Sequence, residues 1–200
     1  MVLSKQEIPH AWMTVEVDVT DLVAYRNEIK NEFIQTEGFN LTYFSFFVKA
    51  VAQALKKYPQ LNSTWQQDKI IQRKAINLSI AVAVGEELFV PVIKNADEKT
   101  IKGIAREINE LAAKAQSKKL SAEDMRGGTF IINHPQAAIL QVESIVRRPV
   151  IIDNMFAARD MVNLSLSLDH RVLDGLVCGK FLAYLKEILE NMNEKNTQVF

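Results

Sequence analysis

Hydrophobic and polar residues alternate strictly along residues 164–169, where leucines take every second position and two serines and an aspartate lie between them. A period of two predicts a half-buried strand whose leucines face a core. Beyond Gly175 the apolar residues recur every three or four positions, which predicts a helix. His170 therefore lies at a predicted strand-to-helix junction, where the backbone is held firmly while the side chain can reach a cleft.

The same two periods predict further elements along the chain. Strands are expected at residues 12–19, 69–73, 77–84, 88–93, 137–142, 148–156 and 161–168, and helices at residues 20–33, 43–55, 97–114 and after Gly175. Thr20 or Asp21 is expected to cap the first helix. Gly85 to Glu87 read as a hairpin turn, and Ser121 to Asp124 as a short capped turn. Strands and helices alternate irregularly, which favours an α/β or α+β fold, a two-layer mixed sheet with helices, over a doubly wound one.

Composition indicates one globular domain. The 200 residues are 48% hydrophobic, enough for a substantial core. The 24 basic and 24 acidic side chains cancel and no basic block occurs, so no nucleic acid is expected as a partner. The longest apolar stretch, residues 76–84, is too short to span a bilayer, and residues 1–6 lack the apolar core of a signal peptide. The single cysteine, Cys178, precludes an intrachain disulfide and suits a reducing compartment.

His170 is the best candidate for acid–base chemistry among the three histidines. Imidazole titrates near neutral pH, so it can take a proton from an alcohol or thiol and return it within one turnover. A hydrogen-bonded histidine at a strand end is the plainer alternative. Asp174 follows four positions later. Its carboxylate either caps the next helix or serves the chemistry, and the two roles are compatible.

Other polar residues have weaker claims to a site. Ser165 and Ser167 could face a channel, but the solvent side of a strand explains them more simply. Cys178 has apolar neighbours and is expected to be a packed thiol rather than a nucleophile. His134, before Pro135, is expected to be a loop residue. No His/Cys cluster has metal-ligand spacing and no glycine-rich phosphate loop occurs, so no metal is expected.

Five motifs follow one another along the chain: Ile8-Pro9-His10, Phe89 to Lys94, Gly127-Gly128-Thr129-Phe130, Ile132 to Leu140, and Asp169 to Gly175. A histidine and an acid at this spacing are a weak signal alone, but all five motifs in this order are specific. With them the chain resembles, over essentially its whole length, the C-terminal catalytic domain of the dihydrolipoyl acyltransferases of 2-oxo acid dehydrogenase complexes. Residues 141–146 and 160–164 are most similar to bacterial branched-chain members.

The resemblance implies a chloramphenicol-acetyltransferase-like fold and transfer of a branched-chain, isobutyryl-like acyl group between the dihydrolipoyl thiol and coenzyme A. His170 is then the general base that deprotonates the attacking thiol. Asp174 steadies the loop around it through an arginine and need not touch the imidazole. His10 lines the coenzyme or lipoyl path, or contacts a neighbouring subunit. Coenzyme A is a substrate, and the lipoyl group is carried covalently on a domain outside this chain. The alternatives are an acetyl-transferring pyruvate dehydrogenase member, a catalytically silent structural core, and a related acyltransferase with a hydroxyl acceptor.

The resemblance also implies an assembly. Residues 1–200 are expected to form one catalytic domain, with the lipoyl and peripheral-subunit-binding domains absent. Homotrimers are expected to build a 24-mer or 60-mer core with active sites between subunits, joined by the decarboxylase and dihydrolipoyl dehydrogenase components in a bacterial cytoplasm. No membrane partner is expected. Residues 196–200 end on apolar side chains that a lone monomer would expose, which favours burial against another subunit.

One departure from the family pattern concerns the oxyanion of the reaction. Family members carry a loop between the Gly-Gly-Thr-Phe tetrad and the next motif, and that loop usually supplies the oxyanion donor. Here Phe130 runs directly into Ile131. Either the sequence omits a mobile loop or the chain is a truncated, impaired variant, and the intact flanking motifs favour the first explanation. An intact mass of 22.7 kDa, that of the sequence as it stands, would contradict it.

Overall fold

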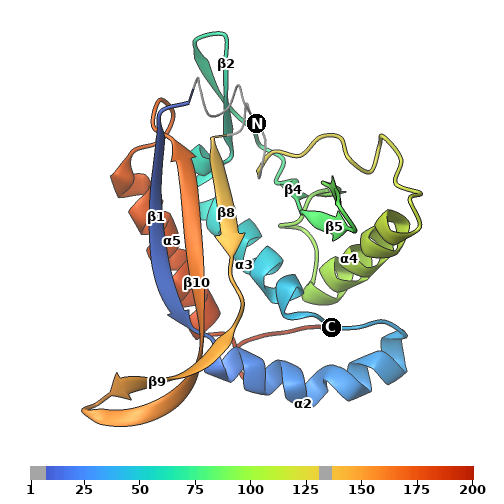
Figure 1. Cartoon of the computed structure of the whole chain (residues 1–200), viewed down its shortest axis with the longest axis vertical. Helices are drawn as coiled ribbons and strands as arrows, with labels where there is room; N and C mark the ends of the chain where they lie inside the picture. Colours follow the sequence, from blue (N-terminus) through green and yellow to red (C-terminus); the bar gives the residue numbers. More distant parts are fainter. Residues whose placement is uncertain (1–7, 131–136) are drawn as a thin grey trace.

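The computed structural model describes residues 8–130 and 137–200, which form a two-layer α+β fold (Figure 1). The expected class is confirmed. The ladders between the named strands are antiparallel, and a parallel bridge joins Leu78 to Phe130. The elements are β1 (His10–Asp18), α2 (Thr20–Glu37), α3 (Tyr43–Lys57), η1 (Pro59–Leu61), β2 (Ser63–Gln66), β3 (Lys69–Gln72), β4 (Leu78–Ser79), β5 (Val82–Val84), β6 (Glu87–Phe89), β7 (Val92–Ile93), α4 (Ile101–Gln116), β8 (Ala138–Val142), β9 (Val146–Ile152), β10 (Met155–Asp169) and α5 (Gly175–Glu190).

The long strand β10 organises the main sheet. Its second half pairs with β1 on one edge and with β8 on the other, while its first half pairs with β9. The register places His10 opposite Asp169 and Ala138 opposite Leu168, so the ends of three strands meet where β10 stops. This end of the sheet carries the turn with His170.

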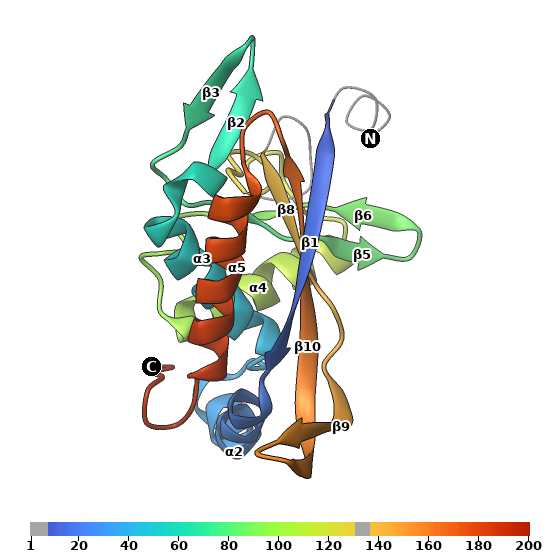
Figure 2. The same cartoon turned by 90° about the vertical axis from the view of Figure 1, so that its left-hand side faces the viewer.

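Helices α3 and α5 cover one face of the sheet (Figure 2). The alternation in β10 is confirmed, because Leu164, Leu166 and Leu168 are at most 2% exposed and belong to the core. The fully buried ring of Phe181 on α5 packs against Phe130, with 6.3 Å between ring centroids. Truncating a buried phenylalanine to alanine costs about 3–5 kcal/mol. The contact between Phe181 and Phe130 joins α5 to the segment that ends at Phe130, which bridges to β4 and not to the main sheet.

Two tight turns were missed by the sequence prediction. The strand predicted at residues 148–156 is in fact two strands, β9 and β10, joined at Asp153 and Asn154, whose φ values are 51° and 61°. Two consecutive residues with positive φ are typical of the type I′ hairpin turn, for which Asn and Asp are suited. A second hairpin, β2–β3, turns at Gln67 and Asp68 in the same way, and its first strand was not predicted.

The strands predicted at residues 77–84 and 88–93 are each broken into two short ones. Strand β4 pairs with β7, and β5 pairs with β6 in a separate hairpin. The predicted turn at Gly85 is confirmed, and its φ of 61° suits glycine. Pro91 lies between β6 and β7, where its carbonyl accepts a hydrogen bond from the Ile80 amide at 2.9 Å. The ring therefore interrupts the ladder without breaking the pairing on either side.

Two expectations about chain ends and caps were wrong. The N-cap of α2 is Val19, while Thr20 is the first helical residue and its hydroxyl donates to the Asp18 carboxylate at 2.5 Å. The C-terminal tail also does not expose all its apolar residues, because Val199 is 1% exposed within the chain itself. Its carbonyl accepts from the Lys102 amide at 3.0 Å, and only Phe200 beyond it is 58% exposed.

Candidate active site

His170 lies where the sequence placed it, in the turn between the last residue of β10 and the first of α5. Its side chain is exposed. Its backbone amide donates to the carbonyl of Pro9 at 3.0 Å, which ties the turn to the chain just before β1. The imidazole is thus accessible while its backbone is fixed.

The turn itself is built on Asp169. The Asp169 carbonyl accepts from the amides of Val172 and Leu173, both at 3.0 Å, and its own amide donates to Ala137 at 2.8 Å. Leu173 is 3% exposed and anchors the far side of the turn in the core. Both ends of the five-residue connection are therefore held by packing and hydrogen bonds.

The carboxylate of Asp169 is nearly buried and is paired with Arg171. The guanidinium makes contacts of 3.0 Å and 3.2 Å from Nε and 2.7 Å from the Nη2 atom, and the Arg171 amide adds one of 3.0 Å. Burial by itself raises the pKa of Asp169, but hydrogen bonds and charge from Arg171, with a smaller contribution from His10, bring the pKa below its usual value. Asp169 is an anion engaged by its neighbour rather than a proton carrier.

A second hairpin reaches this turn through Arg171. The guanidinium carbon lies 5.1 Å from the ring centre of Trp65, which belongs to β2. Such stacking is worth about 0.5–2 kcal/mol, depending on how far the cation is desolvated. Trp65 had no assigned role in the sequence prediction, because nothing in its local pattern connects it to residue 171.

Asp174 is the N-cap of α5. Its side chain accepts a hydrogen bond from the Val177 amide at 2.8 Å. The capping role expected from the sequence is therefore present in the structure. The carboxylate thus steadies the turn through a backbone amide, while Arg171, the arginine within the turn, pairs with Asp169.

The weaker candidates His10, Ser165 and Ser167 come together on one face of the sheet. Pairing of β1 with β10 sets His10 opposite Asp169, Trp12 opposite Ser167, and Thr14 opposite Ser165. The two hydroxyls of the last pair are hydrogen bonded at 2.9 Å. This face points away from α3 and α5, and Trp12 on it is 79% exposed. This surface carries the exposed ring of Trp12 beside the half-buried hydroxyls and leads to the His170 turn.

Cys178 is a packed thiol, as expected. It is 0% exposed on α5, and burial raises its pKa to about 11. The neutral thiol is a poor nucleophile, so Cys178 is no candidate for covalent chemistry. His134 and the expected loop position between Phe130 and Ile131 lie at or within residues 131–136, outside the described part of the chain.

An apolar cavity of about 350 Å³ lies between α3 and the strands β4 and β8. Sequence reasoning missed it, because its walls come from four separate segments. Its lining is mostly apolar and includes Phe47, Val51, Leu78 and Leu140. Neither His170 nor another residue of the Asp169–Gly175 turn lines it, so the cavity is separate from the exposed imidazole.

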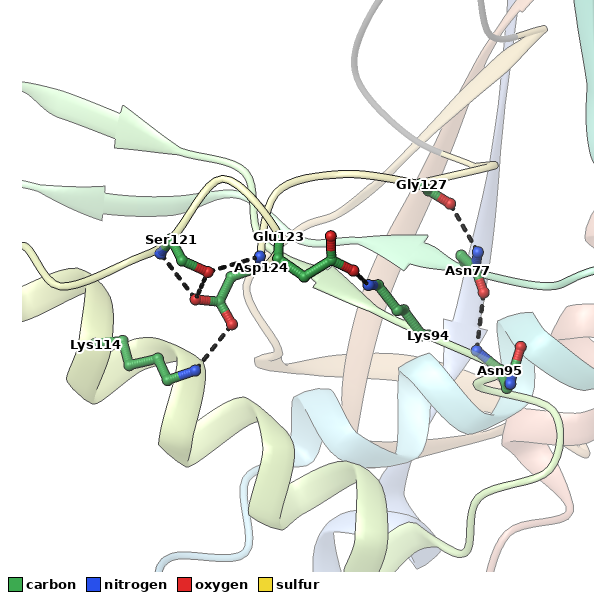
Figure 3. A network of polar contacts seen from close by, with 8 residues as sticks. All are labelled: Asn77, Lys94, Asn95, Lys114, Ser121, Glu123, Asp124 and Gly127. Atoms are coloured by element: carbon green, nitrogen blue, oxygen red, sulfur yellow. Dashed lines mark hydrogen bonds and ion pairs between the residues drawn. The ribbon is translucent and has the colours of Figure 1, made fainter.

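A polar network fixes the chain that leads to Gly127 and Phe130 (Figure 3). The Asn77 side chain donates to the Gly127 carbonyl at 2.7 Å and accepts from the Asn95 amide at 2.9 Å. The predicted turn at Ser121 is confirmed, since the Asp124 carboxylate accepts from both the amide and the hydroxyl of Ser121 at 2.8 Å. The remaining contacts join Lys94 to Glu123 and Lys114 to Asp124. The network therefore has a structural role, because its charged side chains pair with one another.

Among residues 8–130 and 137–200, no cluster of three or more His, Cys, Asp or Glu side chains is arranged to hold a metal ion. None of the helices in that part of the chain is both long enough and apolar enough to cross a membrane.

The fold is of a recognised class. Chloramphenicol acetyltransferase matches 92% of this chain with a TM-score of 0.56 at 13% identity, which shows a shared fold alone. More specifically, the family described as 2-oxoacid dehydrogenases acyltransferase (catalytic domain) matches residues 1–195. The chain belongs to this family, as its five motifs predicted.

The most informative sequence relative is the lipoamide acyltransferase component of the branched-chain alpha-keto acid dehydrogenase complex of Bacillus subtilis (strain 168). It is 66% identical over 210 residues, which cover 97% of this chain and 50% of the relative. The chain thus spans about half the length of that protein. The 210 aligned positions exceed the 200 residues of this chain, so the relative has residues there that this chain lacks.

Solved structures agree on the fold. A probable dihydrolipoamide acetyltransferase from Listeria monocytogenes 4b F2365 has a TM-score of 0.97 and 64% identity, covering 100% of this chain and 92% of that one. The dihydrolipoamide acetyltransferase of Azotobacter vinelandii, studied for a serine, a histidine and an asparagine in its mechanism, has a TM-score of 0.89 at 34% identity, covering 94% and 84%. The cubic core of a pyruvate dehydrogenase multienzyme complex has a TM-score of 0.88 at 35% identity, with the same coverage.

Proposed function

We propose that this chain is an acyltransferase domain that moves a branched-chain, isobutyryl-like acyl group between the thiol of a dihydrolipoyl group and that of coenzyme A. The observation that carries the proposal is its 66% identity to the B. subtilis branched-chain lipoamide acyltransferase component over 97% of the chain. The Listeria structure carries an acetyltransferase name instead. The acyl group is therefore the part of the proposal that most needs a direct test.

His170 acts as the general base in the proposed reaction. Its imidazole takes the proton from the attacking thiol, and the thiolate adds to the thioester carbonyl. The tetrahedral intermediate then collapses, and the leaving thiolate recovers a proton from the imidazolium. A free thiol with a pKa near 8.5 is only partly ionised at neutral pH, so a positioned base contributes about 10²–10⁴-fold. An accessible side chain on a fixed backbone supports this role.

Asp174 has a structural part in the proposed site. The histidine and asparagine named for the A. vinelandii enzyme are four positions apart, the same spacing as His170 and Asp174. An asparagine keeps the hydrogen-bonding oxygen of an aspartate but has no charge. The match therefore supports a shared capping or orienting role more than an ionic one.

The family pattern places the oxyanion donor in a loop that this sequence lacks between Phe130 and Ile131. We infer that the residues that the B. subtilis relative has in excess include this donor. Removing one such donor from other enzymes costs about 10²–10³ in kcat. The mass of the intact protein decides whether the natural chain is longer than 200 residues.

Coenzyme A is proposed as a substrate, and the lipoyl group as a substrate borne on another domain. The face that carries exposed His10 and half-buried Ser165 and Ser167 ends at the His170 turn, which supports approach of both thiols along it. No metal is part of the proposed reaction.

We further propose that residues 1–200 act as one catalytic domain of a homotrimer, and that trimers build a 24-mer or 60-mer core. The β9–β10 hairpin supports this, since it projects from the body of the fold (Figure 1) and exposes Ile151, Met155 and Phe156 by 68%, 69% and 84%. Exposed apolar residues grouped in this way favour burial against another subunit. The decarboxylase and dihydrolipoyl dehydrogenase components of a bacterial cytoplasmic complex are the proposed partners. Sedimentation that finds only monomers would contradict the assembly.

The reaction class is tested by mixing isobutyryl-coenzyme A with dihydrolipoamide and following free coenzyme A. Transfer by the wild-type chain and a loss of about 10²–10⁴-fold in His170→Ala are expected. A folded His170→Ala variant with full activity would exclude the base. No transfer at all would favour a silent structural core. Preference for an alcohol acceptor over the dithiol would favour the hydroxyl-acetylating alternative.

A further inference from the structure

Arg171 connects the His170 turn to a hairpin that belongs to a different sheet. On one side its guanidinium donates hydrogen bonds from Nε and Nη2 to the Asp169 carboxylate at the end of β10. On the other side it lies over the ring of Trp65 on β2, 5.1 Å from the ring centre. β2 pairs with β3, whereas β10 belongs to the main sheet. Arg171 is thus held from two independent parts of the fold.

His170 is the residue between the two members of this ion pair. Its predecessor is fixed by the bond from the Asp169 amide to Ala137 at 2.8 Å, and its own amide by Pro9 at 3.0 Å. Its successor is fixed because the Arg171 amide donates to the Asp169 carboxylate at 3.0 Å. The backbone dihedrals of His170 are therefore restrained from both sides. Because the accessible rotamers depend on the backbone, the direction of the imidazole is restrained as well.

We propose that the Asp169–Arg171 ion pair, stacked on Trp65, is a positioning clamp that aims the His170 imidazole at the reacting thiol. The clamp rests on the proposed function of His170, and it adds Arg171 and Trp65 to the site as residues that act through the histidine. An error of about 1 Å in the position of a catalytic group can cost about 10²-fold in rate. Restraint of the turn is then expected to appear in kcat.

The Arg171 guanidinium already contacts Asp169 and Trp65. This favours a positioning role over direct binding of a phosphate of coenzyme A. The Asp169 side chain is 2% exposed and that of Arg171 26%, so the pair is largely covered. A phosphate-binding arginine would affect mainly the KM for coenzyme A. A positioning arginine affects mainly kcat, because it changes the geometry of the base and not the affinity for the substrate.

The shape of the contact makes conservative substitutions informative. Lysine keeps the charge of Arg171 but has no planar fork for the carboxylate and stacks less well on a ring. Phenylalanine at position 65 keeps a ring face, whereas alanine removes it. The test set is therefore Arg171→Lys, Trp65→Ala and Trp65→Phe. Lys69→Ala is the matched control, since Lys69 is an exposed residue on the same hairpin.

The experiment measures kcat and KM for isobutyryl-coenzyme A and dihydrolipoamide, after thermal melts have confirmed that each variant folds. Arg171→Lys and Trp65→Ala are expected to lose about 10- to 100-fold in kcat with KM within about twofold. Trp65→Phe is expected to recover most of that loss, and Lys69→Ala to match the wild type. If Trp65→Ala does not fold, Arg171→Lys and Trp65→Phe still decide the question.

A readout independent of turnover is the rate at which diethylpyrocarbonate modifies His170, followed by peptide mass spectrometry. Loosening the clamp is expected to change this rate severalfold in Arg171→Lys and Trp65→Ala but not in Lys69→Ala. Wild-type kcat in both clamp variants, or a loss confined to KM, would overturn the proposal. If the wild-type chain transfers no acyl group, the proposed function fails, and unchanged modification rates in the clamp variants would then reject the clamp separately.

Discussion

At the scale of single residues, the sequence predicted where a residue lies in its strand, turn or helix better than which distant side chain it contacts. His170 at a strand-to-helix junction, Asp174 as a cap and Cys178 as a packed thiol follow from local pattern alone, and the structure has all three in those places. The contact of Arg171 with Trp65 could not be predicted in this way. It depends on how a short hairpin folds back on the main sheet, and no periodicity within either segment encodes that.

Cys178 gives a direct test of burial at this scale. Because its pKa is raised to about 11, the native thiol is expected to react slowly with Ellman's reagent at pH 8 and rapidly after unfolding in guanidinium chloride. The burial favours the neutral thiol, so its contribution to stability is present below the unfolded pKa of about 8.5 and is lost as the pH rises toward the native value. Equal labelling rates in native and unfolded protein would contradict this.

Gly128 gives a second test, which asks whether the packing around this position leaves room for a side chain. A Cβ atom at this position would lie 2.1 Å from the Oγ atom of Ser79, a residue that is 4% exposed. Gly128→Ala is expected to lower the free energy of unfolding by about 1–3 kcal/mol, measured by urea denaturation. The double variant with Ser79→Ala removes the colliding hydroxyl and is expected to regain most of the loss. Additive losses in the double variant would show that the collision is not the cause.

At the scale of elements, two of the hairpin turns carry no glycine, and these were the ones that the sequence did not predict. The predicted strand at residues 148–156 is divided by Asp153 and Asn154, both with positive φ. The residues on both sides of this turn have the pattern of one continuous strand. Only Asp153 and Asn154 indicate the turn in the sequence. Longer elements such as α3 and α5 were predicted well, since their periodicity extends over several turns.

The N-cap of α5, Asp174, ends the turn that carries His170, so its hydrogen bond stabilises the candidate site. Asp174→Ala removes the hydrogen bond to the Val177 amide and is expected to cost about 1 kcal/mol of stability. Asp174→Asn is the matched control, because asparagine caps about as well. If the role is structural, Asp174→Asn also keeps most of the acyl-transfer rate. An asparagine variant that is as stable as the wild type but inactive would indicate an ionic role for the carboxylate.

At the scale of the whole molecule, the motifs were more informative than composition. Length, charge and periodicity predicted one globular α+β domain, and the motifs added the family, which the match over residues 1–195 confirms. The acyl group is harder to predict, because discrimination between small acyl chains depends on a few pocket side chains. The names of the two similar proteins differ on this point.

The proposed acyl transfer and its preference for branched chains are both measured by a steady-state comparison of isobutyryl-, isovaleryl- and acetyl-coenzyme A with dihydrolipoamide, on protein of verified mass. A branched-chain acyltransferase is expected to have a kcat/KM for isobutyryl- or isovaleryl-coenzyme A at least about tenfold above that for acetyl-coenzyme A, since each methylene in a matched pocket is worth about 1–3 kcal/mol. The ratio does not depend on an intact oxyanion loop, because the donor serves all three thioesters alike. A preference for acetyl-coenzyme A would contradict the proposed acyl group, and transfer of none of the three would contradict the proposed reaction.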